Sequence, residues 1–185
     1  METKRHPHET VLETFHFNGA TAELVQWDAA VWCGSLEYAV NNTDEPDVET
    51  ALNRFMALPF DAVPKAEEGW DTCISLNYLC SARPNGVMFA VLAVSDAVPE
   101  GFDVLRTTIS LYMRITLDEV TAHAIGEQPW EGGIPPYHWI GEKIAPMFGY
   151  TYSEDTLPVV EYYGNYNPQT NTYQYRHLYV PVKKL

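Results

Sequence analysis

Residues 157–170, LPVVEYYGNYNPQT, and residues 173–182, YQYRHLYVPV, form the stretch from which the fold is predicted. The first run begins with alternating β-branched and aromatic residues and then changes to turn residues, with Gly164, two asparagines and Pro168. The second run again alternates aromatic and aliphatic residues. Two strand-like runs separated by turn residues are typical of a β-hairpin, so we expect the chain to end in two antiparallel strands.

The carboxylate of Glu161 lies in the middle of the first of these strand-like runs. Burying a carboxylate without a partner is costly in free energy, so this residue needs an explanation. It could lie at a solvated edge, be held by a buried arginine such as Arg106 or Arg114, or be placed to meet a positively charged ligand. The sequence leaves these alternatives open.

Side-chain alternation assigns the residues of the hairpin to two faces. In its first strand, Glu161 shares a face with Tyr163. In its second strand, the aliphatic residues are expected to meet the helices, and these are Leu178, Val180 and Val182. His177 and Tyr179 alternate with them, so we expect both on the opposite face, beside Glu161.

The order of the expected elements repeats along the chain. The first half reads strand, helix, strand, strand, in residues 21–34, 41–58, 72–80 and 86–94. The second half reads the same way, in residues 104–117, residues 136–148 and the terminal hairpin. Two tandem β-α-β-β units predict an α+β domain with pseudo-symmetric repeats, an antiparallel sheet, two helices on one face and a ligand cleft on the other. The repeats are expected at about residues 15–98 and 99–185, after a flexible tail at residues 1–14.

Apolar residues at helical spacing place the two helices. In the first helix, Thr43 or Asp44 is the expected N-cap, and the buried stripe is Val48, Ala51, Leu52 and Phe55. In the second helix, Pro146 is expected to bend or shorten the last turn, and the buried stripe is Ile140, Ile144 and Met147.

The composition excludes several classes of protein. The 185 residues include 11 Lys and Arg against 25 Asp and Glu, which gives a formal net charge of −14. A protein that binds nucleic acid directly needs a basic surface, which this chain lacks. No segment approaches the ~20 apolar residues of a membrane-spanning helix, and no signal peptide opens the chain. We therefore expect a cytoplasmic protein with reduced cysteines, no cofactor and no metal site.

Aromatic residues are abundant, with 12 Tyr and 5 Trp. Aromatic walls around one acid suit a flat, hydrophobic cation, which they attract by stacking and cation–π interaction. The alternative is that the tyrosines cover a sheet surface and keep their hydroxyls in water.

Segments spread over about residues 22–185 resemble the GyrI-like small-molecule-binding family, which also occurs as the effector-binding domain of AraC-type and multidrug-responsive regulators. The segments are DAVPEGFDVLRTTISLYMRI (residues 96–115), GGIPPYHWIGEKIAPMFGYTYSEDTLPVVEYYG (residues 132–164) and YRHLYVPVKKL (residues 175–185). The resemblance implies two β-α-β-β units around a ligand cleft. The chain is expected to be a stand-alone member, because its N-terminal segment is too short for a helix-turn-helix region.

The resemblance also implies the residues of the site. It places Glu161 at the floor of the cleft and aromatic side chains around it. The implied ligand-binding residues beside Glu161 are Tyr163, Tyr179, Tyr112, Trp139, Trp32 and Tyr78. The run ISLYMRI lacks the Pro-Ala-Gly that usually precedes the tyrosine in the family, which leaves the placement of Tyr112 open.

Three functions follow from this resemblance. The first is binding of hydrophobic, cationic small molecules, for sequestration or sensing. The second is hydrolysis of cyclopropane-bearing DNA-alkylating compounds, in which Glu161 positions or deprotonates water and Tyr179 or Tyr163 donates a proton. The third is a protein-interaction module, such as a topoisomerase inhibitor, with a protein partner.

Overall fold

The structure is a computed structural model that describes residues 9–41, 44–59, 70–76, 84–93, 97–118, 120–121, 137, 139–153, 158–164, 170, 172 and 175–185. Its strands are β1 (Glu9–Phe17), β2 (Ala20–Trp27), β3 (Ala30–Tyr38), β4 (Trp70–Leu76), β5 (Gly86–Ala93), β6 (Asp103–Thr107), β7 (Ser110–Leu117), β8 (Tyr150–Tyr152), β9 (Val159–Gly164) and β10 (Tyr175–Lys184). Its helical segments are α1 (Val48–Ala57), the π-helix η2 (Trp139–Ile144) and α4 (Ala145–Met147), which continues η2.

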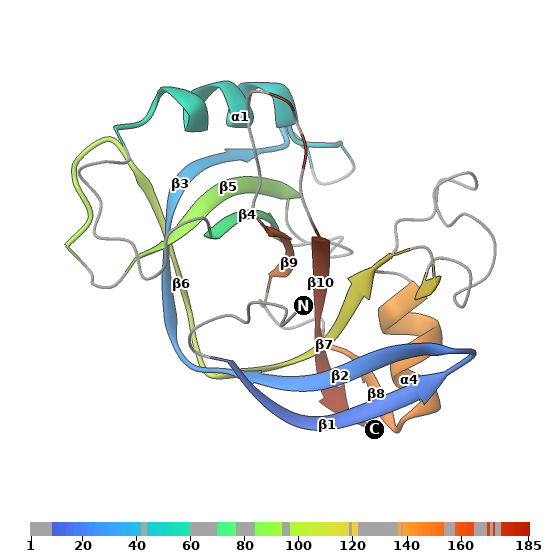
Figure 1. Cartoon of the computed structure of the whole chain (residues 1–185). Coiled ribbons are helices and arrows are strands. Elements are labelled where there is room, and N and C mark those ends of the chain that lie inside the picture. Colours follow the sequence, from blue (N-terminus) through green and yellow to red (C-terminus); the bar gives the residue numbers. More distant parts are fainter. Residues whose placement is uncertain are drawn as a thin grey trace.

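The strands form one antiparallel sheet in the order β1-β2-β7-β10-β9-β4-β5-β3-β6, and β8 pairs with β10. Figure 1 shows this sheet curled into a half-barrel. The repeats meet where β4 pairs with β9, and outward from there the order is β4-β5-β3 in one repeat and β9-β10-β7 in the other. The predicted α+β class, with two β-α-β-β units and an antiparallel sheet, is therefore confirmed.

The repeats also exchange strands. The segment that contains β2 and β3 is expected as one strand, but it is interrupted at residues 28–29, and the segment that contains β6 and β7 is interrupted at residues 108–109. Consequently β3 stays in its own repeat while β2 pairs with β7, and β7 stays in its own repeat while β6 pairs with β3. This exchange extends each half of the curled sheet by strands from the other half.

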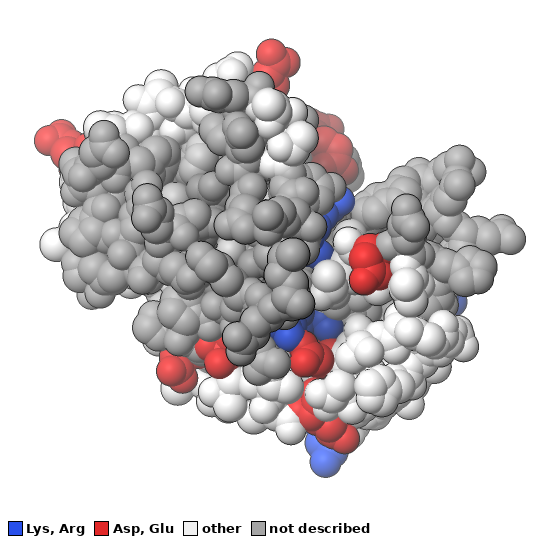
Figure 2. All heavy atoms as spheres, in the orientation of Figure 1, with Lys and Arg blue, Asp and Glu red and all other residues white. Residues whose placement is uncertain are grey.

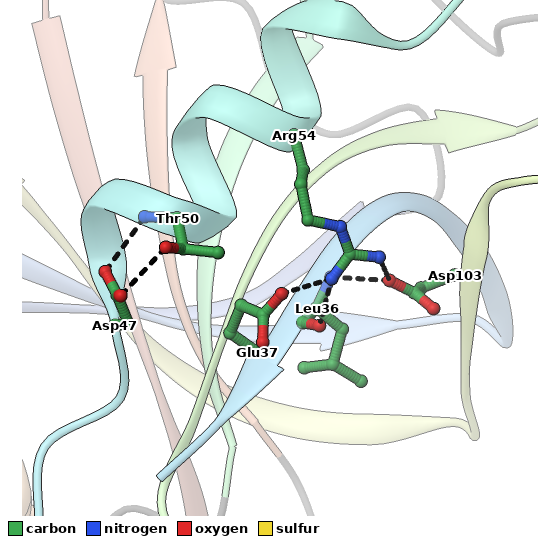
Figure 3. A network of polar contacts seen from close by, with 6 residues as sticks. All are labelled: Leu36, Glu37, Asp47, Thr50, Arg54 and Asp103. Atoms are coloured by element: carbon green, nitrogen blue, oxygen red, sulfur yellow. Dashed lines mark hydrogen bonds and ion pairs between the residues drawn. The ribbon is translucent and has the colours of Figure 1, made fainter.

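The first helix begins later than the sequence indicated. Its N-cap is Asp47, whose side chain accepts a hydrogen bond of 2.9 Å from the backbone N–H of Thr50, so the expected cap at residue 43 or 44 is wrong. Ala51 is buried, as expected, whereas Val48 is 48% exposed. Figure 3 shows the cap, together with the contacts that Arg54 makes beyond the helix.

Arg54 ties α1 to two strands. Its guanidinium contacts the carboxylate of Glu37 and donates to the carbonyl oxygen of Leu36 (3.3 Å) and the carboxylate of Asp103 (3.1 Å). Asp103 also accepts from the backbone N–H of Leu36 at 2.8 Å. Arg54 is about half exposed, so each ion pair contributes little alone, but the network fixes where α1 lies on β3 and β6.

The second helical segment covers the other half of the sheet. Ile140 and Ile144 are buried as predicted, but Met147 is 61% exposed, so its place in the buried stripe is wrong. Pro146 lies in the first turn of α4 and has no N–H to donate, which accords with the π-helical hydrogen bonding of the turn before it. Among the described residues, no helix combines the length and the apolar character that crossing a bilayer requires.

Part of the expected N-terminal tail is a strand. The tail was expected to reach residue 14, but β1 begins at Glu9 and pairs with β2 along its length. The turn between them is Asn18-Gly19, and both residues have positive φ (44° and 85°), as a two-residue type I′ hairpin turn requires. The strand brings Glu9 into the interior, where its side chain is fully buried.

Candidate ligand-binding site

Glu161 lies on the face of the sheet that carries the helices. In β9 it is directly opposite Leu178 of β10, and residues directly opposite each other share a face. Leu178 packs in one apolar cluster with Ile140 and Ile144 of η2. Because the side chain on the helix face at this position is Leu178 and not Tyr179, the expectation that Glu161 lies beside His177 and Tyr179 is wrong.

Helix α1 lies on the same face as Glu161. The Cα atom of Cys73 in β4 is opposite both Glu161 in β9 and Phe89 in β5, so the register carries one face across all three strands. The ring of Phe89 lies 6.1 Å from that of Phe55 in α1, measured between centroids. In the order of strands, β9 therefore stands between the strands under α1 and those under η2.

Glu161 has a resident cation. It is only 5% exposed, and its Oε2 atom accepts a hydrogen bond of 2.6 Å from Nη2 of Arg176. The hydroxyl of Tyr163 donates to the same oxygen. The guanidinium carbon of Arg176 lies 5.4 Å from the centroid of the Tyr163 ring, within the range of a cation–π contact. We call these three residues the Glu161 cluster.

The electrostatics of the Glu161 cluster keep Arg176 charged. Burial acts to lower the pKa of Arg176, but the carboxylate of Glu161 and the hydroxyl of Tyr163 act to raise it, and its net pKa is above the ordinary value. The arginine that holds Glu161 is neither of those considered from the sequence. Arg106 is exposed, and Arg114 lies on the opposite face of the sheet.

Three of the implied cleft residues lie in the concave interior instead. Tyr112, Tyr179 and Trp32 are each 0% exposed and belong to one apolar cluster with Trp27 and Tyr162. We call this cluster the inner aromatic core. It lies on the face on which a ligand cleft was expected, where the curled sheet brings these rings against one another.

The rings of the inner aromatic core are in direct contact. The Trp27 ring centroid lies 4.5 Å from that of Tyr112, 4.7 Å from that of Tyr179 and 5.8 Å from that of Trp32. Burial raises the pKa of Tyr112 and of Tyr179 well above the ordinary value, so both remain neutral phenols at physiological pH. The hydroxyl of Tyr112 has no hydrogen-bond partner among the described residues.

An ion pair adjoins the inner aromatic core. Nη1 of Arg114 lies 2.7 Å from Oε1 of Glu9, and both side chains are almost completely buried. The indole N–H of Trp27 donates to Oε2 of Glu9 at 3.1 Å, and Arg114 also contacts the carboxylate of Glu23. Both carboxylate oxygens of Glu9 and the guanidinium of Arg114 therefore have partners, as is typical of a buried ion pair with a structural role.

Of the two remaining implied residues, the structure describes only Trp139, which is in neither group. Trp139 begins η2 and is half-buried, and Tyr78 lies outside the described residues. The sequence reasoning missed Arg176, although its position two residues before Leu178 places both residues on one face. A register that puts Glu161 opposite Leu178 would have identified Arg176 as the partner, because Arg176 is opposite Tyr163.

Basic side chains are few and occur beside acidic ones. The chain has 11 Lys and Arg against 25 Asp and Glu. Figure 2 shows Lys and Arg atoms along a furrow in this view, with Asp and Glu atoms beside them. The ion pairs of Arg54, Arg114 and Arg176 follow the same pattern, because each of these arginines contacts a carboxylate.

Comparisons with known proteins show the fold. No protein-family model and no curated protein matches the sequence. Among solved structures, SAV2435 bound to tetraphenylphosphonium is 16% identical with a TM-score of 0.56, and the alignment covers 88% of this chain and 93% of that one. A Staphylococcus aureus MU50 protein that is named for bacterial transcription regulation is 16% identical with a TM-score of 0.52, covering 89% and 99%. The C-terminal domain of EcmrR is 10% identical with a TM-score of 0.50, covering 89% and 98%. At these identities the likeness establishes a shared fold, which is consistent with the GyrI-like fold that the sequence resembles.

Proposed function

We propose that the protein binds hydrophobic, cationic small molecules at the Glu161 cluster and acts in sequestration or sensing. The observation that carries the proposal is the way the cluster holds the guanidinium of Arg176, against a buried carboxylate and over an aromatic ring. These are the groups that would recognise a flat organic cation from outside the chain. The net charge of −14 favours the approach of such a ligand over long range.

The fold comparison supports this choice of ligand. The structure of SAV2435, which shares the fold, contains tetraphenylphosphonium, a hydrophobic cation. The position of Glu161 adds to this support, because β9 lies between the strands under α1 and those under η2 in the order of the sheet, so that neither helical segment lies directly over it.

Titration with tetraphenylphosphonium tests the proposal. Isothermal calorimetry on the wild type should show saturable binding, and Glu161→Gln should weaken it by at least about tenfold, since one close charge pair is lost. Glu37→Gln is the matched control. It removes the same charge from a partly exposed ion pair with Arg54, and it should bind like the wild type. Equal affinity in the wild type and Glu161→Gln would show that the ligand binds elsewhere.

The contact between Tyr163 and Glu161 favours hydrolysis as a second candidate function. Glu161 and Tyr179 lie on opposite faces of the sheet, so the expected pairing of these two as catalytic residues is wrong. Tyr163 would have to donate the proton while Glu161 positions water, each role being worth ~10²–10⁴ in rate. Incubation with a cyclopropane-bearing alkylating compound, followed by mass spectrometry, should reveal addition of one water. Recovery of the unchanged compound would exclude this function for that substrate.

A further inference from the structure

We infer that the guanidinium of Arg176 occupies the position that a cationic ligand takes, so that ligands bind Glu161 by displacing it. The inference rests on the proposed function and specifies its ligand class. The ligands that replace Arg176 most completely are aromatic amidinium and guanidinium compounds, which combine a planar delocalised cation with N–H donors.

The contacts of Arg176 define what a replacement must supply. The guanidinium donates an N–H to Oε2 of Glu161 at 2.6 Å, and its central carbon lies 5.4 Å from the centroid of the Tyr163 ring. A planar cation with N–H groups can make both contacts at once. A quaternary phosphonium or ammonium supplies charge but no donor, so it leaves Glu161 with one fewer hydrogen bond.

Glu161 and Arg176 differ in how easily each side chain can leave the ion pair. The side chain of Glu161 is 6% exposed and stands in the middle of β9, whereas that of Arg176 is 17% exposed and belongs to the second residue of β10. Arg176 also has the longer side chain, which can turn its charged end toward water while its stem stays in place. The carboxylate is therefore the fixed part of the site, and the guanidinium is the part that can leave.

Displacement makes the chain's own arginine a competitor of the ligand. Breaking a close charge pair costs free energy that a ligand must recover from its own contacts, so Arg176 lowers the affinity for every cation. This cost is the same for every ligand that displaces Arg176, so the residue sets how tightly cations bind as a class. The preference for N–H cations over quaternary cations of equal charge comes from Glu161, whose Oε2 atom accepts the hydrogen bond that only the former can donate.

A matched pair of probes tests this inference. Phenylguanidinium and trimethylphenylammonium carry the same ring and the same charge, but the second has no N–H donor. Calorimetry should show that wild-type protein prefers phenylguanidinium. In Arg176→Gln the affinity for both probes should rise by at least about tenfold, because the resident competitor is gone. The control is Lys183→Gln, which removes an exposed charge from the same strand and should leave both affinities unchanged.

The outcomes separate the inference from the proposed function. If the wild type binds phenylguanidinium through Glu161 and Arg176→Gln binds it no better, the inference is overturned while the proposed function stands. If neither the wild type, Arg176→Gln nor Lys183→Gln binds phenylguanidinium, trimethylphenylammonium or tetraphenylphosphonium, the proposed function itself fails.

A second measurement does not depend on the folding of Arg176→Gln. In wild-type protein labelled with nitrogen-15, the Nε–Hε resonance of Arg176 should shift and sharpen when phenylguanidinium saturates the site, since the side chain gains freedom in water. Arg176→Lys identifies the resonance by its absence. An Arg176 resonance that is unchanged at saturation would overturn the inference.

Discussion

At the scale of single residues, the clearest agreement between sequence and structure concerns the partner of Glu161. An isolated carboxylate in an apolar strand predicts a nearby positive group, and the structure supplies Arg176 at 2.6 Å. The sequence could not assign the partner, because a shift of one residue in the pairing of two strands moves every side chain to the other face. The register of β9 against β10 is therefore known only from the structure.

Glu161→Gln should destabilise the folded protein. Removing one partner of a buried ion pair leaves the other uncompensated, so we expect a loss of about 3 kcal/mol in the free energy of unfolding. The double variant Glu161→Gln with Arg176→Gln removes both charges and should recover most of that loss. Urea unfolding of the four proteins measures the coupling. An unchanged stability in Glu161→Gln would show that the pair does not form in solution.

Because of His177, the free energy of unfolding should decrease as the pH falls below 6.5. Burial, together with the positive charge of Arg114, lowers its pKa from 6.5 to about 3, while its Nδ1 lies 2.9 Å from the hydroxyl of Thr116. Below pH 6.5 the imidazole takes up a proton in the unfolded chain but stays neutral in the folded protein. The contribution of His177 to the free energy of unfolding is therefore complete above pH 6.5 and is lost as the pH falls toward 3.

The measurement compares the wild type with His177→Gln. The two proteins have the same carboxylates, so any difference between their profiles of stability against pH is caused by the histidine. From neutral pH to about pH 5, urea unfolding should show the wild type losing up to about 1.4 kcal/mol per pH unit more than the variant. Parallel profiles would contradict the burial of a neutral imidazole.

At the scale of elements, the sequence located the short apolar strands more reliably than the interruptions within strands and the strand at the edge of the sheet. Both terminal hairpin strands and the pair β4–β5 lie where alternation and turn residues indicated. The strand β1 was missed, although Asn18-Gly19 is a strong signal for a two-residue hairpin turn. The polar residues that precede this turn outweighed the signal, because Phe17 is the one buried hydrophobic residue of β1 and five of its nine side chains are polar or charged.

Strand β3 depends on a glycine where it pairs with β5 and β6. A Cβ atom on Gly34 would lie 1.8 Å from the carbonyl oxygen of Phe89, which is backbone and cannot move aside without disturbing the sheet. We expect Gly34→Ala to cost about 3 kcal/mol or more in chemical unfolding.

Ser35→Ala, one residue along the strand, is the control for Gly34→Ala. It removes a buried hydroxyl that has no hydrogen-bond partner among the described residues, and it should be neutral or slightly stabilising. Equal losses in the two variants would contradict the close approach at Gly34.

At the scale of the whole molecule, the order of elements predicted the two repeats but not their exchange of strands. Residues 104–117 read as one strand, yet Ile109 is 66% exposed at the break between β6 and β7. The break at residues 28–29 is equivalent in the first repeat. Alternation within a run carries no information about which repeat its ends will pair with, so the curl of the sheet was not predictable from the sequence.

The curl also explains why three of the implied residues, Tyr112, Tyr179 and Trp32, lie together and away from Glu161. Seen as an open sheet, the face of Tyr112 and Tyr179 is free to hold a ligand. In the curled sheet the same rings meet Trp27 and Trp32, and all four are fully buried. Glu161 and Tyr163, at which we propose that a ligand binds, lie on the helix-bearing face.

A crystal structure of the protein with phenylguanidinium bound tests the position of the ligand most directly. We predict that the ligand lies over the ring of Tyr163, donates its N–H groups to Glu161, and leaves the side chain of Arg176 turned toward solvent. A ligand found among Trp27, Tyr112 and Tyr179 in the concave interior, with Arg176 still bonded to Glu161, would contradict the assignment of the site.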